Sequence, residues 1–90
     1  MVVVSKNQDV IWREVDGETV LLNPVTGRYF GLNRVACSFW NKVDGKTTLE
    51  QIIEQLLEEY EVEREVLSQD IRDLAAALAE YQLLMLQAMP

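Results

Sequence analysis

The spacing of the apolar residues changes near residue 33, and this change constrains the fold more than any other feature. Before it, short runs rich in β-branched and aromatic residues are separated by turn residues, a pattern typical of strands and hairpins. After it, apolar residues recur every three or four positions, as on one face of an α-helix. Strands followed by helices predict an α+β domain in which the helices cover one face of a small sheet.

Three strands are expected in the first part of the chain: 9–15, 18–23 and 28–32. Asp16 and Gly17 separate the first two strands and form a dipeptide typical of tight β-hairpins. The segment 23–27, which contains asparagine, proline and glycine, supplies the second turn. We therefore expect a three-stranded antiparallel sheet with its third strand at an edge, preceded by a frayed segment over 1–8.

Three helices are expected after the strands. Asn33 has the place of an N-cap, and the Asp-Gly pair at 44–45 ends the first helix. The threonines at 47–48 precede Glu50 and Gln51 at the spacing of a capping box. The apolar stripe of the second helix is Leu49, Ile52, Ile53, Leu56, Leu57 and Tyr60, and that of the third is Leu67, Ile71, Leu74, Leu78 and Tyr81. Together the elements predict a single domain over 1–90 that resembles a winged helix-turn-helix with the wing placed first.

The composition excludes several kinds of chemistry. The chain contains no histidine, the commonest general base and metal ligand. Its one cysteine, Cys37, has apolar neighbours and no histidine to ionise it, so a buried structural thiol is expected rather than a nucleophile. The carboxylates of the second helix are interpreted as a solvated face, and Trp12 and Trp40 as core or half-buried packing. We therefore expect no catalytic residue, no metal site and no cofactor.

The charge is divided unevenly along the chain. Residues 1–46 carry six basic and five acidic side chains, whereas residues 47–90 carry two basic and ten acidic. An acidic helical half disfavours nucleic acid and favours basic partners. Because the apolar runs are far shorter than a membrane span and no signal-peptide pattern opens the chain, a cytoplasmic protein without membrane contact is expected.

The third strand lacks the usual protection of a sheet edge. Edge strands are commonly blunted by charge, proline or a bulge, and over 28–32 only Arg28 does so. An incoming peptide could pair with this backbone and rest against the third helix, which is the β-augmentation mode of recognition. A purely structural hairpin is the alternative that the pattern leaves open.

Over residues 21–84 the sequence resembles the PqqD family, also called RiPP precursor peptide recognition elements. The resemblance rests on the hairpin "NPVTGRYFGLN", on Trp40, Asp44 and Gly45 near the end of the first helix, on the threonine-capped second helix closing with "EEYEV", and on "DI" followed by leucine in the third. The order and spacing of these features carry the match. Ala36 and Gln82 depart from the family pattern, in which many members have glycine, and the second departure leaves the end of the third helix undefined.

The resemblance implies a non-enzymatic module that binds the N-terminal leader of a ribosomal precursor peptide. The leader would add to the third strand and lie in a groove against the third helix, and the module would present it to a leader peptidase or another modifying enzyme. The residues implied are Arg28, Tyr29, Phe30, Gly31 and Leu32 on the strand side, and Val66, Leu67, Asp70, Ile71, Asp73 and Leu74 on the helix side. Along the strand, Phe30 and Leu32 share one face and Tyr29 and Gly31 the other. The missing side chain of Gly31 would let another backbone or a bulky ligand side chain approach.

Within this family, the chain most resembles the stand-alone leader-binding subunit of lasso peptide biosynthesis, which works beside a cysteine protease that removes the leader. A PqqD-type role in pyrroloquinoline quinone synthesis, with a radical SAM enzyme as partner, is the alternative. A winged-helix DNA-binding regulator shares the topology and is disfavoured by the acidic helical half. A small structural domain without a peptide ligand is the last alternative.

Overall fold

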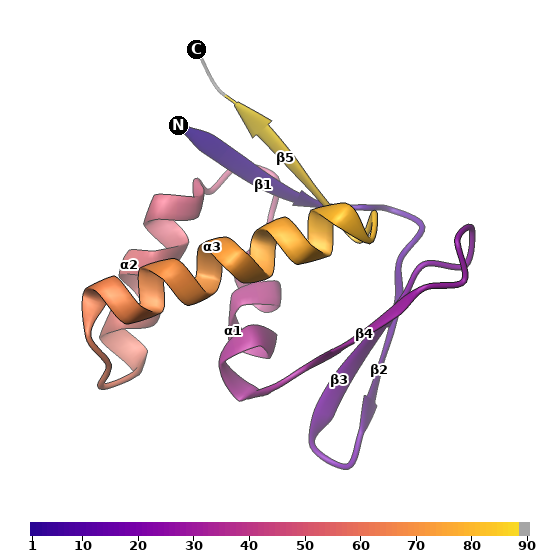
Figure 1. Ribbon diagram of the computed structural model, residues 1–90, viewed down its shortest axis with the longest axis horizontal. Coiled ribbons are helices and arrows are strands. Elements are labelled where there is room, and N and C mark those ends of the chain that lie inside the picture. Colours follow the sequence, from indigo (N-terminus) through magenta and orange to yellow (C-terminus); the bar gives the residue numbers. More distant parts are fainter. Residues whose placement is uncertain (89–90) are drawn as a thin grey trace.

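The computed structural model describes residues 1–88 and is shown in Figure 1. Its elements are β1 (Val2–Lys6), β2 (Ile11–Val15), β3 (Glu18–Leu22), β4 (Tyr29–Leu32), α1 (Arg34–Lys42), α2 (Leu49–Glu59), α3 (Arg64–Glu80) and β5 (Leu84–Ala88). The expected α+β arrangement, a three-stranded antiparallel sheet followed by three helices, is confirmed. A second sheet, formed by β1 and β5, was not expected.

Two turns shape the three-stranded sheet, whose strand order is β2-β3-β4. Asp16 and Gly17 both have positive φ, at 51° and 82°, as a two-residue type I′ hairpin requires. In the second turn, the side-chain oxygen of Asn23 accepts a hydrogen bond from the N–H of Val25 at 2.9 Å. The Nδ2 of the same asparagine donates to the carbonyl of Gln82 at 2.9 Å, which ties this turn to the end of α3. Among the residues that the structure describes, β4 has only β3 as a neighbour in the sheet, so its other edge is open.

The helices begin at the expected caps. The Asn33 side chain accepts a hydrogen bond of 2.9 Å from the backbone of the first turn of α1. Thr48 and Gln51 form a reciprocal capping box at the start of α2, with bonds of 3.1 and 2.9 Å. No side chain caps α3, and its first residue, Arg64, instead forms a salt bridge with Glu54 of α2. The Arg64 guanidinium holds the pKa of the Glu54 carboxyl below its usual value, and the pair holds the start of α3 against α2.

The core lies between the helices and the inner face of the sheet. Its fully buried side chains include Leu21, Leu32, Phe39, Trp40, Ile52, Leu56, Ile71, Leu78 and Leu83. Trp40 therefore belongs to the core, as expected. Trp12 lies at the surface, where 56% of it is exposed and its ring stands edge-on to Trp40 with centroids 6.3 Å apart. Cys37 is a free thiol that packs partly buried against the core.

The expectation that residues 1–8 are frayed is wrong. β1 pairs antiparallel with β5, from Val2 opposite Ala88 to Lys6 opposite Leu84, and Val4 is fully buried. The two strands lie at opposite ends of the chain, so no local turn signal announces their pairing. The chain turns back from α3 into β5 at Gln82, whose φ of 59° is in the left-handed region that favours glycine. Figure 1 shows the second sheet at the end of α3, apart from β2, β3 and β4.

Val4→Ala tests whether β1 is part of the folded core. Removing buried methyl groups should lower the free energy of unfolding by about 1.5–3 kcal/mol, measured by urea denaturation with circular dichroism. Val25→Ala is the control, because Val25 is 78% exposed in a turn, and it should change stability little. Equal stabilities for the two variants would mean that the first strand is frayed after all.

Candidate functional site

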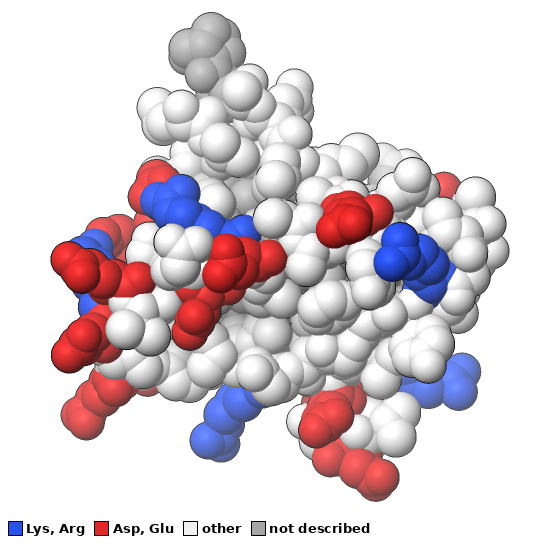
Figure 2. Space-filling view, in the orientation of Figure 1, with Lys and Arg blue, Asp and Glu red and all other residues white. Residues whose placement is uncertain are grey.

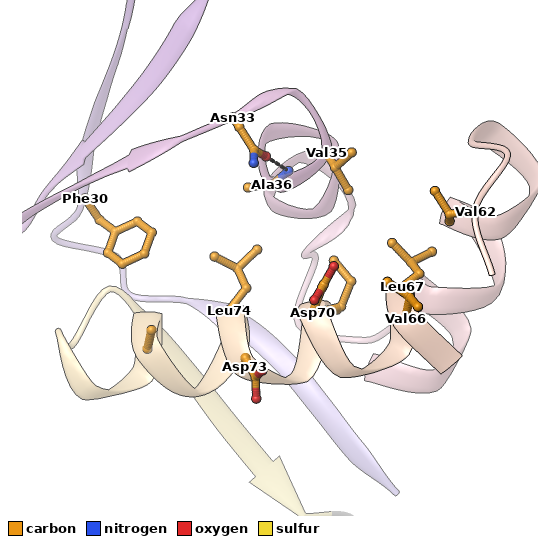
Figure 3. Close-up of a pocket in the computed structure, with 12 residues that line it drawn as sticks. Phe30, Asn33, Val35, Ala36, Val62, Val66, Leu67, Asp70, Asp73 and Leu74 are labelled. Carbon is orange, nitrogen blue, oxygen red and sulfur yellow. Dashed lines mark hydrogen bonds between the residues drawn. The ribbon is translucent and has the colours of Figure 1, made fainter. Parts of the chain in front are cut away.

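A groove with a volume of about 490 Å³ separates the β4 edge from α3 (Figure 3). One wall is formed by β4 and the start of α1, the other by one face of α3, and Val62 closes the far end. The lining residues are Phe30, Asn33, Val35, Ala36, Val62, Val66, Leu67, Asp70, Ile71, Asp73, Leu74 and Ala77. Most of these side chains are apolar, so the groove is suited to apolar ligand side chains.

The α3 wall arises from helical spacing. The residue pairs 66–67, 70–71 and 73–74 recur every three or four positions and therefore share one face. Leu67 and Ile71 are buried and form the floor of the groove. Val66 is 52% exposed, and Figure 3 shows it at the end of the groove near Val62. The apolar stripe of α3 thus packs against the core and also lines the groove.

The side chains of β4 point alternately to the two faces of the sheet. Leu32 is fully buried in the core, whereas Phe30 lines the groove with its ring edge-on to Tyr81 at a centroid distance of 5.5 Å. Tyr29, 69% exposed, and Gly31 lie on the opposite face. Only Phe30 of the five strand-side residues therefore lines the groove with its side chain.

The backbone of β4 offers hydrogen-bonding groups to an additional strand. The carbonyl of Arg28 accepts a hydrogen bond of 2.9 Å from the N–H of Asn23, on the β3 side. Main-chain groups alternate in direction along a strand, so the N–H and C=O groups of Tyr29 and Gly31 point to the open edge. Within the described residues, no strand pairs with this edge, which leaves four main-chain groups available beside the groove.

The charges around the groove are mostly acidic. Figure 3 shows Asp70 pointing into the groove. Asp73 also lines the groove, but its carboxylate is turned to the outer side of α3, where Gln69 donates a hydrogen bond of 2.9 Å to it. Arg64 and Arg72, the arginines of α3, form salt bridges with glutamates of α2. Figure 2 shows acidic side chains gathered over α2 and the first half of α3. The groove therefore favours a ligand that carries basic residues.

Arg28 lies at the other end of the groove. Its guanidinium stands over the ring of Tyr81, with the central carbon 3.7 Å from the ring centroid, a cation–π geometry. Its side chain does not line the groove but contacts the end of α3, beside the ring of Phe30 that also packs on Tyr81. The structural position of Arg28 is thus at the junction between β4 and α3.

The structure brings all six helix-side residues and Phe30 together around one groove. Their part in binding stays a prediction. Sequence reasoning missed further lining residues, namely Asn33, Val35, Ala36, Val62 and Ala77. Val62 had a signal, because it is the one apolar residue within the charged segment of residues 61–65. Asn33 was interpreted only as a helix cap, and Ala36 only as a departure from the family pattern.

Within residues 1–88, no helix combines the length and the apolar character that crossing a membrane requires. No group of three or more metal-ligating side chains lies close enough in the same residues to hold a metal ion. The described part of the chain thus shows neither a membrane span nor a metal centre.

Comparisons with known proteins point to one family. The family model described as Coenzyme PQQ synthesis protein D (PqqD) matches residues 18–84. Curated protein sequences gave no match. Among solved structures, TbiB1 in complex with the TbiA(beta) leader peptide superposes with a TM-score of 0.80 and 34% identity, over 94% of this chain and 99% of that chain.

Two further structures are similar over most of their length. A lasso peptide synthetase B1 complexed with the leader peptide has a TM-score of 0.78 and 26% identity, over 91% of this chain and 96% of the other. The PqqD truncation of Methylobacterium extorquens PqqCD, a stand-alone RiPP recognition element, has a TM-score of 0.75 and 29% identity, over 92% and 88% of the two chains.

Proposed function

The chain belongs to the PqqD family, and from this membership and the geometry of the groove we propose that it binds the leader segment of a ribosomally synthesised precursor peptide and delivers it to a processing enzyme. PqqD-type recognition elements are peptide-binding modules without catalytic activity. The observation that carries the proposal is the open backbone edge of β4 beside an apolar groove.

The leader adds to the sheet as a strand next to β4. Its backbone pairs with the outward N–H and C=O groups of Tyr29 and Gly31, and every second side chain enters the groove toward Phe30 and Leu74. An antiparallel direction matches the pairing of the other strands and is slightly more stable per residue than a parallel one. Affinity thus comes from the backbone, and specificity from the side chains that the groove accepts.

We propose further that the pathway is lasso peptide biosynthesis and that the partner is a leader peptidase in the cytoplasm. The proposal is supported by the likeness to a lasso peptide synthetase B1, which was solved with its leader peptide and is matched over 96% of its length. The PqqD truncation supports the alternative, a role in pyrroloquinoline quinone synthesis with a radical SAM enzyme. A neighbouring gene for a transglutaminase-like protease would favour the first pathway, and one for a radical SAM enzyme the second.

Calorimetric titration with the leader peptide of a precursor gene found beside the gene for this chain tests the proposed function. We expect a dissociation constant of about 1 μM or lower, equivalent to about −8 kcal/mol.

Tyr29→Pro should weaken binding about tenfold, because it removes an outward backbone donor. It should leave the circular dichroism spectrum unchanged, because edge strands tolerate proline. Val25→Ala should bind like the wild type.

Two outcomes would count against this account of binding. Absence of heat and of chemical-shift change at tens of micromolar peptide would contradict the proposed function. Unfolding of Tyr29→Pro would show instead that the N–H of residue 29 bonds to β3, and the outward direction of the edge groups would be wrong.

Asp70→Asn tests the acidic character of the groove. Exposed charges act mainly on the rate of association and are screened over about 8 Å at physiological salt. The variant should therefore slow association of a leader that carries lysine or arginine and flatten its salt dependence, as measured by stopped-flow fluorescence at low and high salt. Asp73→Asn is the comparison variant. A smaller effect is expected because the Asp73 carboxylate, although the residue lines the groove, is turned to the outer side of α3 (Figure 3) and accepts a hydrogen bond from Gln69. Equal salt slopes for wild type and Asp70→Asn would mean that Asp70 is only a solvated charge.

A further inference from the structure

The outer face of the three-stranded sheet, which turns away from the helices, is unusually apolar. The solvent side of an antiparallel sheet normally carries polar residues. Here Ile11 is 52%, Val15 48% and Tyr29 69% exposed. A hollow of about 330 Å³ on this sheet is lined by Ile11, Trp12, Arg13, Val15, Val20 and Leu22. The apolar residues of this outer face do not line the groove, which lies on the opposite face of the sheet, so peptide binding in the groove does not explain their exposure.

Gly31 lies between this outer face and the open edge of β4. It is paired with Val20 of β3, and Val20 in turn with Arg13 of β2. A Cβ atom added at Gly31 would meet no atom within 4 Å, and its φ is not in the left-handed region. Neither packing nor backbone conformation therefore requires glycine at this position in the free protein.

We infer that Gly31 forms a second subsite, on the outer face, for a large apolar and preferably aromatic side chain of the peptide strand that adds to β4. This inference rests on the proposed function and names a specificity determinant of the same peptide. The subsite at Gly31 lies on the opposite face of the sheet from the groove and binds a different residue of the peptide.

Strand geometry sets the position of this side chain. In an antiparallel pair, directly opposite residues project to the same face. The peptide residue opposite Gly31 therefore projects to the outer face, and its two neighbours in the peptide project into the groove. Adjacent strands are about 4.8 Å apart, so a large side chain crosses the bare backbone of Gly31 and contacts half-buried Val20 on β3. Aromatic side chains that cover a cross-strand glycine are a known stabilising arrangement.

The neighbouring side chains favour an apolar occupant. Tyr29 flanks the subsite on the same face, and Leu22 lies opposite Tyr29 on β3. Arg13, the basic residue in the row of Gly31, is two strands further in, beyond the reach of a short acidic side chain from the peptide. With the peptide bound as a fourth strand, its apolar side chain would join those of the outer face in one continuous apolar surface.

Selection from a phage-displayed library of random peptides of about twelve residues tests the inference, with wild type and Gly31→Val as targets. A Cβ atom at this position meets no atom within 4 Å and valine suits a strand, so circular dichroism should show an intact fold. Wild type should enrich peptides with groove-directed apolar residues at alternate positions and an aromatic residue between two of them. Gly31→Val should lose the aromatic preference at that one position and keep the others.

An enriched peptide and its aromatic-to-alanine variant then complete a double-mutant cycle by calorimetry. Gly31→Val should weaken the aromatic peptide about tenfold and the alanine peptide less than about threefold. Identical enrichment patterns for the two targets, or equal losses in the cycle, would overturn the inference and leave the proposed function standing. Failure of wild type to enrich any peptide would overturn both.

Discussion

The groove depends on the contact between the second turn of the sheet and the end of α3. Asn23 is almost completely buried, and its side chain both organises the turn and donates to the carbonyl of Gln82. Tyr81, one residue before, receives the ring of Phe30 and the guanidinium of Arg28. These contacts hold the edge of β4 at a fixed distance from α3, so the protein's own packing shapes the groove. A preformed site avoids part of the ordering cost that binding a disordered peptide incurs.

This arrangement separates the backbone pairing of a peptide, which does not depend on its sequence, from the selection of its side chains. In the proposed mode of binding, the outward main-chain groups of Tyr29 and Gly31 would bond to any peptide in extended conformation, whatever its sequence. In the same proposal the two faces of β4 would distinguish peptides by alternate side chains, because one face borders an apolar groove and the other an apolar outer surface. The acidic helices add a preference for basic ligands that acts over a longer range. Such a division would suit the proposed role, in which the protein holds a leader while the rest of the precursor is processed.

Local signals made much of the fold predictable from the sequence. The Asp-Gly turn, the Asn33 cap and the capping box at Thr48 each act within a few residues, and each was recognised correctly. The pairing of β1 with β5 joins the two ends of the chain without a turn signal and was missed. For the site, helical spacing placed Leu67, Ile71 and Leu74 on one wall. It could not show that Asp70 points into the groove and that the Asp73 carboxylate is turned to the outer side of α3, because that depends on how α3 is rotated against β4.

Amide hydrogen exchange of residues 29 to 32, followed by NMR with and without leader peptide, tests the central claim most directly. In the free protein, the amides of Tyr29 and Gly31 face solvent and should exchange fast, while those of Phe30 and Leu32 face β3 and should be protected. Addition of the leader should protect Tyr29 and Gly31 selectively. Binding of the leader without any new protection at these two amides would contradict strand addition at β4.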